Sequence, residues 1–184
     1  MKLKDLKIKG SHETKNFGTD IVEIREKLEM SWPPPTNAKM EEIVAIGINP
    51  SKAGKIVNAE PIRDRTVSML AAFLNDNGFC KCTMINLFEC VTPEQGNIDQ
   101  RAATDFKKHE DLLSSAGIIL IIWGLGNNYV EQKKELFEIL MKYNNKLYCI
   151  KDKQGKYPRH PSRMSYDSEI VKCKIDGNMN LILE

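Results

Sequence analysis

The sequence lacks long hydrophobic runs and paired cysteines. Its longest apolar run, residues 118–123, is far shorter than the roughly 20 residues of a membrane-spanning helix. None of the five cysteines forms a Cys-x-x-Cys pair, which argues against a zinc site or a small disulfide scaffold. The N-terminus is lysine-rich but has no apolar stretch of a signal peptide. We therefore expect a cytoplasmic protein with reduced thiols, no membrane segment and no metal cluster.

The net charge is also small. With 27 Lys and Arg against 25 Asp and Glu, it is +2, so no overall field indicates polyanion binding, although a local basic face remains open. A chain of 184 residues with 41% hydrophobic content can bury one sizeable core. We predict a single domain over 1–184, with an N-terminal arm (1–20), an α/β core (21–166) and a C-terminal hairpin (167–184).

Compact apolar runs alternate with segments of helical spacing along the core. The apolar runs, typical of strands buried on both faces, are 43–48, 83–88, 118–123 and 147–150. The helical segments are 66–74, 102–113 and 129–143. This alternation predicts a three-layer α/β sandwich with a four-stranded, mainly parallel sheet. Residues 21–32 fit a short strand pair or a helix.

Polar residues stand where several predicted strands end. Asn49 precedes Pro50, Asn86 ends the second run, and His160 precedes Pro161. Ligand crevices of open α/β sheets lie beyond the carboxyl ends of the strands, so we expect these side chains to share a cleft. Each also has a structural alternative: Asn49 in a turn, Asn86 as a cap, and His160 on the surface.

Two other polar residues are assigned structural roles. Asp64 is expected to cap a helix N-terminus in preference to acting as a site carboxylate. His109 is expected on a solvent-exposed helix face.

Blocks of this sequence resemble known families. Four blocks are similar, in order, to those of uracil-DNA glycosylases: 47–50, 84–87, 121–124 and 160–165. The stretch from about Arg25 to Tyr166 more closely resembles a bacterial and phage family catalogued as domain of unknown function 1643. That resemblance lies in Asn49-Pro50-Ser51, Asp64-Arg65-Thr66, Asn86-Leu87-Phe88 and Pro158-Arg159-His160-Pro161.

The glycosylase resemblance implies a uracil-DNA glycosylase-like fold and hydrolysis of an N-glycosidic bond to a pyrimidine, possibly a modified one. The substrate would be DNA, single-stranded or with a flipped base, or a nucleotide, and no cofactor would be needed. In this reading His160 acts as electrophile, Asn49 positions water and Asn86 reads the base. The alternative is a catalytically silent nucleotide- or nucleic-acid-binding module of the same fold.

Further positions complete the expected site. Phe88 and Ser51 would contact the base, although a core role is favoured for Phe88. Met164 would be the apolar wedge of the resemblance. The expected nucleic-acid contacts also include Arg159, Arg163, Ser162 and Lys52.

Two departures from the glycosylase pattern bear on chemistry. Asn49 stands where the most efficient enzymes have Asp, which predicts slow turnover because water can only be oriented. Ser51 stands where they have an aromatic residue, which predicts a pocket open to 5-substituted pyrimidines.

Overall fold

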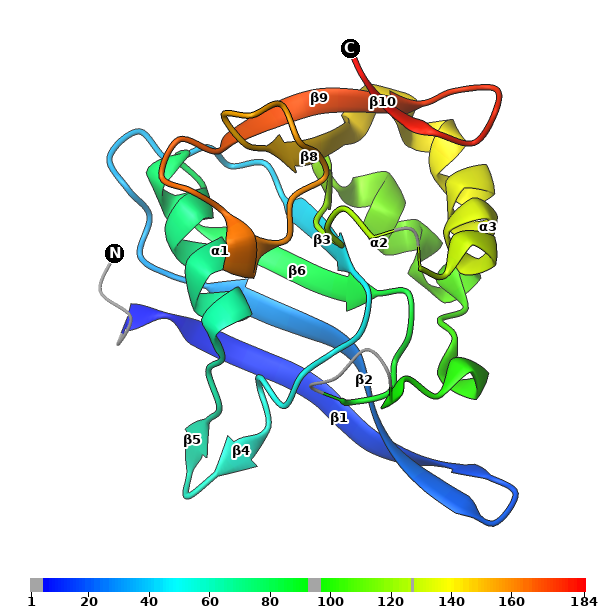
Figure 1. Cartoon of the computed structure of the whole chain (residues 1–184). Helices are drawn as coiled ribbons and strands as arrows, with labels where there is room; N and C mark the ends of the chain where they lie inside the picture. The colour runs from blue at the N-terminus through cyan, green and yellow to red at the C-terminus, as the bar shows by residue number, and fades with distance from the viewer. Residues whose placement is uncertain (1–4, 93–96, 127) are drawn as a thin grey trace.

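The middle layer of the protein is an eight-stranded mixed sheet (Figure 1). The computed structural model describes residues 5–92, 97–126 and 128–184. The sheet order is β1-β2-β6-β3-β7-β8-β9-β10. The strands are β1 (Lys7–Phe17), β2 (Asp20–Ser31), β3 (Ile43–Gly47), β6 (Lys81–Asn86), β7 (Ile118–Ile121), β8 (Leu147–Lys151), β9 (Glu169–Ile175) and β10 (Leu181–Leu183). A separate small hairpin pairs β4 (Ile56–Val57) with β5 (Glu60–Pro61).

The four predicted apolar runs form the centre of this sheet. Strands β6, β3, β7 and β8 are parallel neighbours, and residues 43–47 of β3 are all buried. The prediction of a four-stranded, mainly parallel sheet is nevertheless wrong, because antiparallel strands extend both sides. β2 pairs with β6, and β9 pairs with β8.

The two outer strands on the N-terminal side, β1 and β2, were not predicted as part of the sheet because they are only partly buried. β1 mixes buried, intermediate and exposed positions, so it lacks the continuous apolar run of a strand buried on both faces. Residues 21–31 belong to the single strand β2, not to a strand pair or a helix, and Trp32 follows its end. At the C-terminus, β9 and β10 form the predicted antiparallel hairpin.

Helices cover both faces of the sheet (Figure 1). α1 (Arg65–Asp76) packs on one face, and α2 (Glu110–Ser115) and α3 (Val130–Leu140) pack on the other. Short 3-10 turns occupy 100–102, 106–109, 141–146 and 161–163. The described residues therefore form a three-layer α/β arrangement, and none of their helices is long and apolar enough to cross a membrane.

The helix predicted at 102–113 is broken into shorter pieces. Ala103 instead bridges to Phe88 in an antiparallel pair. The Asp105 carboxylate then accepts from the Lys107 N–H and starts the turn before α2. Local capping by a short acidic side chain competes with continuous helix here.

Two apolar cores lie on either side of the central strands. Val67, Leu70 and Leu74 of α1 pack on one face, and Leu136 and Leu140 of α3 pack on the other. Alternate residues of each central strand supply the two cores, as strand geometry requires.

His109 lies inside the core region and not on an exposed helix face, contrary to the sequence prediction. It is 4% exposed, and its Nε2 has no hydrogen-bond partner. Its ring stands edge-on to Phe106, with centroids 6.3 Å apart. Burial lowers the pKa of His109, so the neutral ring is favoured in the folded protein.

Candidate functional site

A cavity of about 530 Å³ opens beyond the carboxyl ends of β3 and β7. Its volume lies within the range usual for small-molecule sites, about 300–1,000 Å³. Several loops, the strands β2, β3 and β6, and the first turn of α1 contribute to the wall. The lining residues used below are Arg25, Gly47, Asn49, Ser51, Asp64, Thr66, Met84, Thr92, Trp123, Gly124, Arg159, His160, Ser162 and Arg163.

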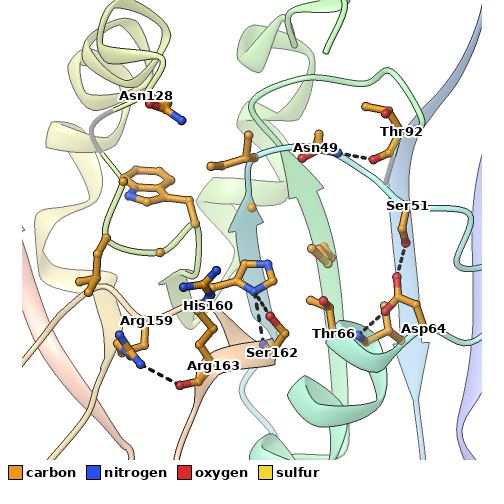
Figure 2. Close-up of a pocket in the computed structure, with 18 of the residues that line it drawn as sticks. Asn49, Ser51, Asp64, Thr66, Thr92, Asn128, Arg159, His160, Ser162 and Arg163 are labelled. Carbon is orange, nitrogen blue, oxygen red and sulfur yellow. Dashed lines mark hydrogen bonds between the residues drawn. The ribbon is translucent and has the colours of Figure 1, made fainter. Parts of the chain in front are cut away.

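His160 projects into this cavity from the loop between β8 and β9 (Figure 2). Its Nδ1 accepts from the Ser162 backbone N–H at 3.3 Å and lies 2.8 Å from Ser162 Oγ. Because a backbone N–H can only donate, Nδ1 carries the lone pair and the neutral ring is protonated at Nε2. In Figure 2 that second nitrogen points away from Ser162, toward the open cavity.

The surroundings of His160 favour its neutral form. Burial lowers the pKa of His160, the charge of Arg163 lowers it further, and the Asp64 carboxylate opposes the shift. The ring is therefore an uncharged hydrogen-bond donor at neutral pH.

Asn49 faces the cavity from the loop after β3 (Figure 2). Its Nδ2 donates to the Thr92 carbonyl, and the Thr92 N–H donates back to the Pro50 carbonyl. This pairing fixes the orientation of the amide and leaves Oδ1 as the free acceptor. The predicted sharing of one cleft by Asn49 and His160 agrees with this cavity.

Ser51 and Asp64 form a polar wall next to Asn49 (Figure 2). Ser51 Oγ donates to Asp64 Oδ2, while Asp64 Oδ1 accepts from the Val67 N–H at 2.7 Å. Asp64 is thus the N-cap of α1, as the sequence predicted. It also lines the cavity, so capping and a position at the site are combined in one residue.

Asn86 lies beside the cavity and not on its surface. The residue is 1% exposed, and neither Nδ2 nor Oδ1 has a hydrogen-bond partner. Gly47 makes the space for it, since a Cβ there would stand 2.6 Å from Asn86 Oδ1 and 3.0 Å from the Met84 methyl carbon. An unpaired buried amide lowers stability by about 1–3 kcal/mol. A ligand with a matching donor and acceptor would remove this penalty.

Arg159 and Arg163 lie at the cavity as predicted. Arg159 is held in place, because its Nε lies 3.2 Å from Asp152 Oδ2 and its Nη2 donates to the Arg163 carbonyl. Arg163 is exposed. The charge of Arg159 is therefore partly compensated, and that of Arg163 is the more available.

Besides Asn86, three expected site residues do not line the cavity. Phe88 is fully buried and packs edge-on against Tyr129, with centroids 4.8 Å apart. Met164 packs against the core beneath α1. Lys52 is exposed outside the lining set.

Trp123 and Arg25 line the cavity but were absent from the predicted site. Trp123 follows β7, and the Lys133 ammonium lies 5.4 Å from its ring centroid. Arg25 lies between Ile24 and Glu26 in β2, a partly buried strand with several charged residues, so nothing in the local sequence marks it as a site residue.

The loop after β7 passes close to His160. Gly124 has φ of +89°, and a Cβ there would stand 3.3 Å from the His160 Cβ. A glycine is therefore required by backbone conformation. Lys133 Nζ also donates to the Gly126 carbonyl at 2.7 Å, which fixes the loop.

The chain belongs to the family described as protein of unknown function (DUF1643), whose family model matches residues 25–162. The match begins at Arg25 and ends at Ser162. It therefore includes every lining residue named above except Arg163. No curated protein and no solved structure shows a significant match to this chain.

Proposed function

We propose that this protein hydrolyses the N-glycosidic bond of a pyrimidine deoxynucleotide unit, in the manner of uracil-DNA glycosylases. The observation that carries the proposal is the pairing of an oriented imidazole N–H and an oriented amide oxygen in one cavity. Such a pair meets the two needs of the reaction, a donor for the departing base and a holder for water.

The chemistry assigns one role to each residue. Asn49 Oδ1 accepts a hydrogen bond from a water molecule and orients its oxygen toward C1′ of the sugar. As the C1′–N bond breaks, the bonding electrons leave with the base, and His160 Nε2–H stabilises the oxyanion that forms on it. The water oxygen bonds to C1′, and its proton finally neutralises the base.

The unpaired amide of Asn86 supports a base-reading role. A pyrimidine edge offers a carbonyl acceptor next to an N–H donor, which complements an amide. For that contact the Met84 methyl group, which stands over Gly47 with the amide, has to move aside. Methionine side chains adapt in this way at low cost.

Ser51 supports the admission of a modified base. Its hydroxyl is turned to Asp64, and the side chain is small. A substituent at pyrimidine C5 therefore meets little bulk at this position.

The test is release of free base from single-stranded DNA containing uracil or 5-hydroxymethyluracil. We expect slow release, with the modified base at least as good a substrate as uracil. His160→Ala should lower the rate by about 10²–10⁴-fold, the usual contribution of a positioned proton donor. Asn49→Asp should raise it, because a carboxylate can take a proton from water as well as orient it.

The pH dependence gives a second readout. Because the pKa of His160 is lowered, the rate should stay level down to about pH 6.5, the ordinary value for histidine. It should fall only under more acidic conditions, where Nδ1 of His160 is protonated. The ring then no longer accepts from the Ser162 N–H and loses its orientation.

Absence of base release from DNA and from nucleotides, with binding retained in wild type and His160→Ala, would favour a silent binding module.

A further inference from the structure

Arg25 carries a buried positive charge that the protein does not fully pair. The residue is 1% exposed, yet it lines the cavity. Its Nη1 donates to the carbonyls of Ser51 at 3.2 Å and Ala53 at 2.9 Å, while Nε has no partner. A guanidinium has five N–H donors, so much of its capacity is unused.

The nearest source of compensation is itself engaged elsewhere. The charge of Asp64 acts on Arg25, but the Asp64 oxygens bond to Ser51 and Val67. Burial lowers the pKa of Arg25 to about 10, so the side chain remains a cation at neutral pH. A buried cation of this kind is costly without an anion beside it.

Other groups at the same end of the cavity also favour an anion. α1 begins at Arg65, and Thr66 in its first turn lines the cavity. The N–H groups of a helix N-terminus bind anions, although the Asp64 carboxylate already accepts from the Val67 N–H here. Arg163 lines the same cavity and adds positive charge to it, and this charge reaches His160.

We propose that this end of the cavity is a phosphomonoester subsite centred on Arg25, so that nucleoside monophosphates are among the substrates. The proposal rests on the proposed function for the base half of the ligand. An internal DNA phosphate carries a nucleotide on each side, and both would have to pass through the cavity to reach a side chain buried this deeply. A terminal phosphate carries only one substituent and can enter phosphate first.

The direct test compares matched ligands on the wild-type protein. Binding of dUMP, dCMP and dTMP is measured by calorimetry beside that of the three parent deoxynucleosides, with inorganic phosphate as competitor. We expect at least one monophosphate to bind about tenfold or more tightly than its nucleoside, as charge-assisted hydrogen bonds provide. Inorganic phosphate should compete with it.

Variants locate the effect. Arg25→Gln should reduce the monophosphate-to-nucleoside affinity ratio to near one, and Arg25→Lys should restore part of it. The matched control is Arg101→Gln, because Arg101 is exposed and pairs with Asp99 and Asp20 away from the cavity. Thermal unfolding of each variant shows whether it is folded, and the wild-type comparison stands independently of them.

The outcomes separate this proposal from the proposed function. Equal affinity for every monophosphate and its nucleoside overturns the subsite, and base release from DNA would then still support glycosidic hydrolysis. A phosphate-dependent gain in affinity with no base release from any substrate supports the subsite and contradicts the hydrolysis.

Discussion

At the scale of single residues, Gly47 shows how one missing side chain shapes the site. The strand partner of Gly47 is Asn86, and the Asn86 amide fills the space where a Cβ would stand. The absence of a side chain at Gly47 therefore lets the unpaired Asn86 amide lie against the end of β3. Any larger residue has to displace that amide or the neighbouring Met84 methyl group.

We predict that Gly47→Ala destabilises the fold by about 1–3 kcal/mol, the usual cost of overpacking a filled site. Urea unfolding measures it. The matched control is Gly126→Ala in the same cavity wall, where a Cβ meets nothing within 4 Å. Its effect should stay within about 0.5 kcal/mol, and equal losses in both variants would contradict the crowding argument.

At the scale of elements, Asp64 joins α1 to the loop after β3. Its two carboxylate oxygens bond to the first turn of the helix and to Ser51. Thus one residue sets both the start of α1 and the position of the cavity wall. The stability of the helix and the shape of the site are linked at this point.

We predict that Asp64→Ala lowers the free energy of unfolding by about 1 kcal/mol through loss of the N-cap. Asp64→Asn should lose less, because the amide oxygen still accepts from the Val67 N–H. Chemical denaturation of the three proteins checks the order. Identical losses for Ala and Asn would assign the effect to charge and not to capping.

The elements most visible in the sequence were those buried on both sides. The central strands have continuous apolar runs, and Asn49 lies just beyond the carboxyl end of β3, whereas His160 comes from the long loop after β8 and not from a strand end. β1 and β2 lacked such a pattern, because one part of each strand faces solvent. Arg25 was missed for the same reason: its place in the cavity depends on β2 pairing with β6, a long-range contact without a local signal.

At the scale of the whole molecule, buried histidine connects stability to pH. Burial lowers the pKa of both His109 and His160, so folding favours their neutral forms. This contribution is complete above the unfolded-state pKa, about 6.5. It is lost as the pH falls through the lower pKa values of the folded state.

We predict that the free energy of unfolding decreases as the pH falls from 7 to 5. His109→Leu should flatten part of that decrease, since it removes a ring whose Nε2 is buried without a partner. Urea titrations at several pH values measure the slopes. An unchanged slope in His109→Leu would mean that other groups control the acid sensitivity.

The cysteines report on the whole fold in a different way. All five are free thiols, and four are buried, whereas Cys80 is partly accessible. Burial raises the pKa of Cys82 to about 12 and also raises that of Cys90. Reactive thiolate is therefore suppressed in the folded protein.

We predict that Ellman's reagent modifies about one thiol quickly in the native protein and the rest only on unfolding. Cys80→Ser should remove the fast phase. A fast phase of two or more thiols would contradict the packing around the central strands.

The walls of the cavity come from positions as far apart as Arg25 and Arg163. During synthesis on the ribosome, β2 emerges long before the loop that carries His160, and domains generally fold as units. In a nascent chain, β2 with Arg25 is therefore present before the loop that completes the cavity. Ligand binding therefore requires the chain to extend through the loop that carries His160, and a fragment that stops before this loop should not bind ligand.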